Sequence, residues 1–201
     1  MRAPLVEFGV AARKLAGQSE CGDLHVVRDV PGGQFVAAID GLGHGEEAAI
    51  AARMAADILI AASGAGPVEL FRYCHETLRG TRGAVMSLVW FDGSDHTMTW
   101  LGVGNVEGRL LPSHSPEGAP GKSLMLRAGI LGHNLPNLAV SVYPVGPGDE
   151  AILCTDGIDP GFTCPAGTHN SPQGAADRIM AEYSRDNDDA LVVVARYLGT
   201  P

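Results

Sequence analysis

Hydrophobic and polar residues alternate in two short segments near the start of the chain. Residues 24–30 (LHVVRDV) and 34–39 (QFVAAI) both have the two-residue period of a strand. They flank residues 31–33 (PGG), which are typical of a tight turn. We therefore expect a β-hairpin, with its second strand leading directly into the glycine-rich sequence DGLGHG.

The period changes to that of a helix after this hairpin. Apolar residues recur at helical spacing from residue 46 to about residue 62, and many of them are alanines that allow a second element to approach closely. Residues 63–66 (SGAG) interrupt the pattern, and a proline then starts a second helical segment, 67–79. The short connection predicts an antiparallel helix pair.

The rest of the chain returns mainly to strand patterns. Strands are predicted at 84–91, 96–103, 107–111, around 123–127, 139–143, 150–154 and 190–196, with a helix near 172–184. Residues 112–122 are rich in Pro, Gly and Ser and predict a loop. Helices are too few and too grouped for an alternating parallel sheet, so we expect an α+β fold with antiparallel sheets and helices packed outside them. No linker or repeat divides the chain, which predicts one domain over residues 1–201.

Composition narrows the functional classes. The formal net charge of −9 argues against nucleic acid or an anionic membrane as a partner. It suits carboxylates gathered around a cation, although solubility explains it equally well. The apolar stretch 48–62 contains Arg53 and Asp57 and is too short for a membrane span, and the N-terminus does not resemble a secretory signal. The four cysteines show no metal-ligand spacing. We therefore expect free thiols and a cytoplasmic protein.

Acidic residues recur where predicted strands begin or end. Asp23 precedes a strand, Asp40 and Asp156 each end one and are followed by glycine, and Asp188 and Asp189 precede the last strand. Strand ends can direct short carboxylates into one cleft, and hard cations such as Mg²⁺ and Mn²⁺ prefer these oxygen ligands. A single Asp-Gly pair is usually turn chemistry. Because several aspartates share this position at strand ends, a metal site is a second interpretation of these residues besides turn formation.

The segment 40–45 (DGLGHG) is more specific. Three glycines within five residues allow close backbone approach and positive φ angles. The segment has neither a Walker GK[ST] nor the GxGxxG spacing. His44 is a candidate general acid or a donor behind the metal ligands, and hydrogen bonding to the backbone is the alternative.

Taken in order, CGD at 21–23, DGLGHG at 40–45, TDG at 155–157 and DDALVVV at 188–194 resemble the PPM/PP2C-type serine/threonine phosphatases. The similarity is greatest to the compact bacterial branch that includes SpoIIE-like enzymes and the stressosome phosphatase RsbX. It extends over essentially the whole chain, and RGAVMSL at 82–88 is similar to a central strand of that branch.

The resemblance implies a β-sandwich of two antiparallel sheets flanked by helices, in α-β-β-α layers, with two Mn²⁺ or Mg²⁺ ions at one end. By position, Asp40 would bridge both ions and the Gly41 carbonyl would bind one. Asp156 and Asp188 would complete one shell, and Asp23 would hold the other ion directly or through water. A metal-activated water would then attack phosphorus.

The chain departs from the family pattern in three places. Cys21 stands where serine is frequent, and Asp189 stands where asparagine is frequent. Larger relatives bind the phosphate with an arginine near the N-terminus, for which Arg13 and Arg2 are the nearby candidates.

The implied activity is hydrolysis of phosphoserine or phosphothreonine in a regulatory protein of the STAS-domain, stressosome or partner-switching type. Two alternatives stay open: an inactive relative that binds a phosphoprotein, and a dinuclear phosphoesterase for small esters. Loops at 112–122 and 158–171 are the candidate recognition segments, because loops on a rigid sheet commonly carry recognition.

Overall fold

Strand β3 (Gly33–Gly41) is buried along nearly its whole length because both of its faces are covered. Ala37 and Ile39 point toward helices, whereas Val36 and Ala38 point toward a second sheet. A strand covered on both faces reads as a continuous apolar run, as this one does. The layers of the molecule follow from that burial.

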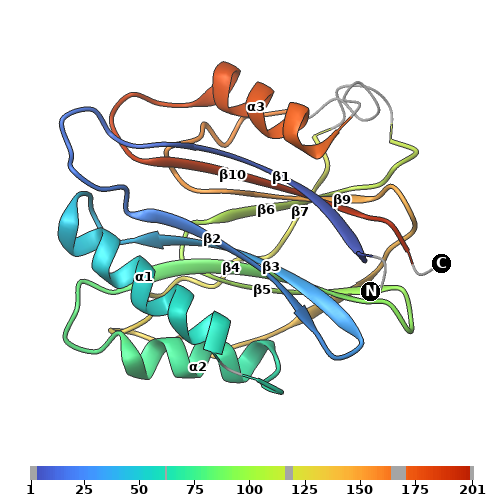
Figure 1. Ribbon diagram of the computed structural model, residues 1–201, viewed down its shortest axis with the longest axis horizontal. Coiled ribbons are helices and arrows are strands. Elements are labelled where there is room, and N and C mark those ends of the chain that lie inside the picture. Colours follow the sequence, from blue (N-terminus) through green and yellow to red (C-terminus); the bar gives the residue numbers. More distant parts are fainter. Residues whose placement is uncertain (1–3, 62, 116–119, 164–170, 200–201) are drawn as a thin grey trace.

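The computed structural model describes residues 4–61, 63–115, 120–163 and 171–199. Two five-stranded antiparallel sheets pack face to face (Figure 1). The first sheet has the strand order β2–β3–β4–β5–β8. Besides β3, it contains β2 (Asp23–Val30), β4 (Ala84–Asp92), β5 (Thr97–Val103) and β8 (Ser141–Pro144). The second sheet has the strand order β1–β10–β9–β6–β7. Its strands are β1 (Val6–Arg13), β10 (Ala190–Tyr197), β9 (Glu150–Cys154), β6 (Glu107–Leu111) and β7 (Lys122–Ser123).

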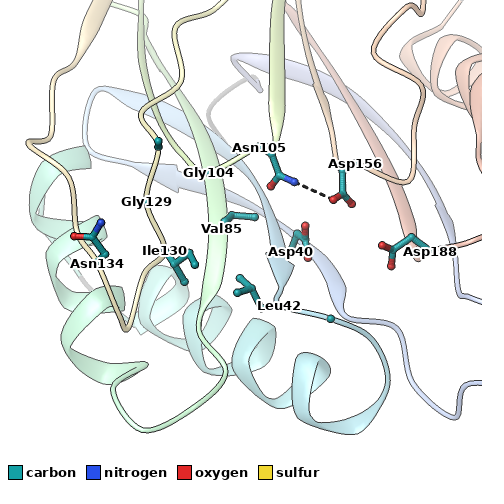
Figure 2. Close-up of a pocket in the computed structure, with 12 residues that line it drawn as sticks. Asp40, Leu42, Val85, Gly104, Asn105, Gly129, Ile130, Asn134, Asp156 and Asp188 are labelled. Carbon is teal, nitrogen blue, oxygen red and sulfur yellow. Dashed lines mark hydrogen bonds between the residues drawn. The ribbon is translucent and has the colours of Figure 1, made fainter.

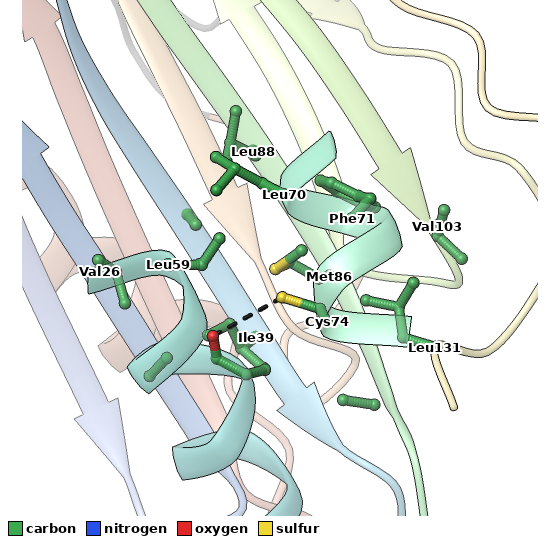
Figure 3. Close-up of a cluster of buried hydrophobic side chains, with 14 of the residues drawn as sticks. Val26, Ile39, Leu59, Leu70, Phe71, Cys74, Met86, Leu88, Val103 and Leu131 are labelled. Atoms are coloured by element: carbon green, nitrogen blue, oxygen red, sulfur yellow. Dashed lines mark hydrogen bonds between the residues drawn. The ribbon is translucent and has the colours of Figure 1, made fainter. Parts of the chain in front are cut away.

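Helices cover the outer face of each sheet. Helices α1 (Glu46–Ala61) and α2 (Pro67–Thr77) lie on the first sheet, and α3 (Pro172–Tyr183) lies on the second (Figure 1). Figure 3 shows Leu59 of α1 and Phe71 of α2 packed above the first sheet, where they join one buried cluster. The predicted α-β-β-α sandwich is therefore confirmed.

A separate core fills the space between the sheets. It contains Trp100 from the first sheet and Val193 and Tyr197 from the second, all fully buried. Its residues alternate along each strand with those that face the helices. This core runs to the end of the sandwich at which the strand-end aspartates lie.

Two parts of the fold differ from the sequence prediction. Strand β1 was not predicted, and its alternation is interrupted by Gly9, where a Cβ atom would lie 2.2 Å from the backbone nitrogen of Gln173 in α3. The strand predicted at 123–127 is reduced to Lys122–Ser123. The chain then leaves one sheet for the other: Leu124 N donates to Gly108 O, and Arg127 N donates to Gly102 O.

None of the helices in the described ranges combines the length and the apolar character that a membrane span needs.

Candidate active site

The register of the first sheet places two of the aspartates side by side. Asp23 of β2 pairs with Asp40 of β3, and Asp40 also pairs with Val85 of β4. Directly opposed residues point to the same face of a sheet. Val85 belongs to the core between the sheets, so both carboxylates point into the gap between the two sheets, at its end.

The second sheet brings two more aspartates to the same end. Asp156 follows β9 and Asp188 precedes β10, which are neighbouring antiparallel strands. With Asp40 they line one cavity of about 630 Å³ (Figure 2). Asp23 is 5% exposed and lies behind this wall, next to Asp40. The sandwich thus brings carboxylates from both sheets together, as the strand-end pattern predicted.

Burial and repulsion between carboxylates dominate the electrostatics of the cluster. Burial, followed by the charges of Asp23, Asp156, Asp188 and Asp189, raises the pKa of Asp40 to about 9. Burial also raises the pKa of Asp23 to about 7, against a hydrogen bond from Thr155 that lowers it. Like charges held together in a desolvated site favour the protonated forms. A bound cation would reverse this preference.

A hard divalent cation fits this set of donors. Among the described residues, no three His, Cys, Asp or Glu side chains converge into a ready-made cage for one metal ion. Mg²⁺ does not require such a cage, because it keeps several waters and uses one or two protein carboxylates. Three carboxylates around an open cavity, with a fourth buried behind them, match that mode of binding.

The glycines of the loop after β3 are required by close contacts and by backbone conformation. A Cβ atom on Gly41 would lie 2.0 Å from the carbonyl oxygen of Ala48 in α1. Gly43 and Gly45 have φ angles of 86° and 77°, in the left-handed region. His44, between them, is exposed and close enough for its charge to lower the pKa of Asp188, although burial raises that pKa more strongly.

Two buried residues of the motif series, Thr155 and Asp189, support the cluster through hydrogen bonds that the motifs alone do not reveal. Thr155 accepts a hydrogen bond from Leu191 N (2.8 Å) and donates one to Asp23 (2.7 Å), thereby linking the two sheets. Asp189 accepts from the backbone nitrogens of Leu15 and Gly22, both at 2.7 Å. Asp189 is therefore placed to fix the loop before β2 rather than to face the cavity.

Asn105 is a further site residue that sequence reasoning missed. Its side-chain amide donates to Asp156 at 2.9 Å, and it lines the cavity beside the Asp40 and Asp156 carboxylates (Figure 2). Gly104-Asn105 reads as a simple turn between two strands. Only the position of that turn, opposite the end of β9, shows its contact with Asp156.

The other sequence candidates lie elsewhere. Arg13 forms an ion pair with Asp186 at 2.8 Å and does not line the cavity, and Arg2 lies outside the described residues. No described residue of 112–122 lines the cavity either. The cavity wall instead includes residues 128–130 and 134, which belong to the connection between β7 and β8.

Comparison with known proteins identifies the family. Residues 31–198 match the family model described as Stage II sporulation protein E (SpoIIE). The chain belongs to the SpoIIE family. The resemblance read from the motif series is confirmed, and the protein is a PP2C-type phosphatase of that family. A comparison with curated protein sequences finds no significant match.

Solved structures agree with this assignment to the SpoIIE family. One similar structure comes from work on the bacterial stressosome, described as a modular system that has been adapted to control secondary-messenger signalling. That chain is 34% identical with a TM-score of 0.85, and the match covers 95% of this chain and 99% of that one. RsbX in complex with magnesium is 19% identical with a TM-score of 0.81, covering 96% and 95%. PstP with two manganese ions is 15% identical with a TM-score of 0.69, covering 96% and 98%.

Proposed function

We propose that this protein is a metal-dependent phosphatase that removes phosphate from serine or threonine of a phosphorylated regulatory protein. The observation that carries the proposal is the meeting of Asp40, Asp156 and Asp188 around one cavity in a SpoIIE-family fold. A cation site explains why carboxylates from both sheets are held together around one cavity, and a purely structural role does not.

The carboxylates and one carbonyl would hold two Mn²⁺ or Mg²⁺ ions. Asp40 lies between the aspartates of the two sheets and is the candidate bridging ligand, with the carbonyl of neighbouring Gly41 beside it. Asp156 and Asp188 would complete one shell, and Asp23 would serve the other ion directly or through water. When bound, such ions lower the pKa of a coordinated water and neutralise the charge of a phosphoryl group.

The chain's own residues prepare the site for this chemistry. Asn105 orients the Asp156 carboxylate, and Thr155 orients that of Asp23. Asp40 and Asp23 must lose their protons when a cation binds, since burial and mutual repulsion raise the pKa of both. His44, exposed between Gly43 and Gly45, is the candidate to donate a proton to the departing serine or threonine oxygen.

The substrate class follows from relatives. The 34% identical chain comes from work on the bacterial stressosome, and the motif series resembles that of the stressosome phosphatase RsbX; both support a phosphorylated STAS-domain protein as the substrate of this chain and cytoplasmic action. The alternative of a small-ester phosphoesterase has less support, because the described cavity wall contains no aromatic or basic side chain to hold a nucleotide.

The test is turnover of a phosphorylated STAS-domain protein, read by intact mass, before and after exhaustive chelation. We expect chelation to abolish activity and Mn²⁺ or Mg²⁺ to restore it. Asp156→Asn should be inactive under all conditions, whereas Asp57→Asn, a matched change at an exposed position of α1, should behave as wild type.

Three results would contradict the proposal. Full activity with no detectable metal would exclude metal dependence. Tight binding of the phosphoprotein without turnover would indicate an inactive relative. Faster hydrolysis of free nucleotides than of any phosphoprotein would indicate a small-ester phosphoesterase.

A further inference from the structure

The cavity that holds the carboxylates has two chemically different halves. Asp156 and Asp188 lie on one side, and Leu42, Val85 and Ile130 lie together on the other side of Asp40 (Figure 2). Ion binding and water activation need only the acidic half. The apolar half therefore has no part in the proposed chemistry.

The apolar half is an open end of the core between the sheets. Val85 is a member of that core, and Leu42 and Ile130 pack against it while staying half-buried. These residues come from three different parts of the chain: the loop after β3, strand β4 and the connection between β7 and β8. Ligand pockets are mostly apolar with a few placed polar groups, and this cavity has that composition.

Backbone pairing on both sides makes this wall preformed. Arg127 N donates to Gly102 O and Arg127 O accepts from Gly104 N, and Leu131 exchanges two hydrogen bonds with Ala84. Ile130 and Asn134 close the intervening turn through two backbone hydrogen bonds of their own. Because these hydrogen bonds hold the backbone of the wall in place, little conformational entropy is lost when a ligand binds to it.

The size of the cavity leaves room beyond the reaction centre. Two ions with their waters and a phosphoryl group correspond to about ten water-sized groups, or roughly 300 Å³ at about 30 Å³ each. The cavity measures about 630 Å³. The remaining space matches one or two medium-sized side chains.

We infer that the apolar half, formed by Leu42, Val85 and Ile130, receives an apolar side chain that flanks the phosphorylated residue of the protein substrate. This inference rests on the proposed phosphatase function and adds a sequence preference to it. A charged side chain is disfavoured here because it would lose water without gaining an ionic partner among the described residues of this half. The exposed Asn134 side chain, across the cavity from Asp188, can bind the substrate backbone (Figure 2).

The experiment measures kcat/KM on phosphothreonine peptides in which each of the two positions before and after the phosphothreonine is Leu, Ser, Asp or Lys in turn. With Mn²⁺ present, we expect Leu at one position to exceed Ser roughly tenfold, the usual discrimination of a hydrophobic pocket. Ile130→Ser should remove most of that preference, and Ile130→Val should keep it. Ile60→Ser, a matched change at an exposed position of α1, should leave it unchanged.

Turnover of the peptide with Ser at that position, which makes no use of the apolar half, serves as the readout for folding and should stay within about twofold in all three variants. Hydrolysis of para-nitrophenyl phosphate by the wild-type protein reports on the reaction centre. Peptide turnover without an apolar preference, or a preference that persists in Ile130→Ser, overturns this inference alone. A preference for Asp or Lys does so as well. Failure to hydrolyse every phosphopeptide and phosphoprotein, with the aryl phosphate still turned over, overturns the proposed function.

Discussion

At the scale of single residues, Asp40 is under the greatest electrostatic strain. It is buried next to Asp23 and faces Asp156 and Asp188, and burial with these charges raises its pKa to about 9. An ordinary aspartate titrates near about 3.9. Without metal, the folded protein therefore holds protons that the unfolded chain releases. Its stability should decrease as the pH rises from about 4 to about 9.

Asp40→Asn tests both roles of this residue. The substitution keeps the volume and removes a carboxyl group that must take up a proton when the metal-free protein folds, so the melting temperature of the chelated protein should rise at pH 8. The decrease in melting temperature between pH 5.5 and pH 8.5 should become smaller than in wild type. Phosphatase activity should fall by orders of magnitude, because a cation site loses its shared carboxylate. Near-normal turnover in this variant would mean that the metal site lies elsewhere.

Asn105 gives a second prediction at this scale. Asn105→Ala removes the hydrogen bond to Asp156 while leaving every proposed metal ligand in place. Loss of such an orienting partner commonly weakens metal affinity or activity by about 10–100-fold. Activity titrated with Mn²⁺ should show that shift. Asn137→Ala, a matched change at an exposed position that does not line the cavity, is the control; an equal shift in both variants would rule out orientation by Asn105.

At the scale of elements, the glycine after Asp40 joins strand β3 to helix α1. Gly41→Ala would place a Cβ atom 2.0 Å from the Ala48 carbonyl oxygen, and the backbone there cannot move without shifting the helix. We expect a loss of about 3 kcal/mol in the free energy of unfolding, at the upper end for overpacking. Urea denaturation measures it. Gly146→Ala, whose nearest neighbouring atom would be 4.0 Å away, should be nearly neutral.

The sequence predicted most elements because their patterns are local. The hairpin around residues 31–33, both helices that follow it, and strands β4 to β6 need only alternation, helical spacing and turn residues. Strand β1 was missed because Gly9 serves contact with α3, which no local pattern records. Residues 123–127 were assigned to one strand because the sequence does not reveal that they pass from one sheet to the other.

The candidate site divides in the same way. Asp23, Asp40, Asp156 and Asp188 could be proposed from the sequence because each lies at a strand end and fits a recurring motif. Thr155 and Asn105 were missed because their roles depend on partners 132 and 51 residues away in the sequence. The apolar wall at Ile130 was missed for the same reason, since it exists only where a connecting segment meets β4.

At the scale of the whole molecule, the site depends on how the two sheets are docked. Thr155→Val keeps the side-chain volume but leaves Asp23 and the nitrogen of Leu191 without their shared partner. We expect a loss of about 2 kcal/mol in the free energy of unfolding, because both groups are buried. Weaker Mn²⁺ binding should accompany it. Thr155→Ser retains the hydroxyl and should lose much less on both measurements; equal losses would show that packing, rather than the hydrogen bonds, is responsible.

The position of β10 has a consequence for the newly made protein. This strand is the last in the domain, yet it lies inside its sheet, between β1 and β9, and Asp188 immediately precedes it. During translation, β1 has no strand to pair with until β10 has been made. The set of four aspartates is also incomplete until Asp188, just before β10, has been added. A ribosome-bound chain can therefore form the β2–β3 hairpin and helix α1 early without gaining activity. We therefore expect phosphatase activity only after β10 has emerged and been inserted between β1 and β9.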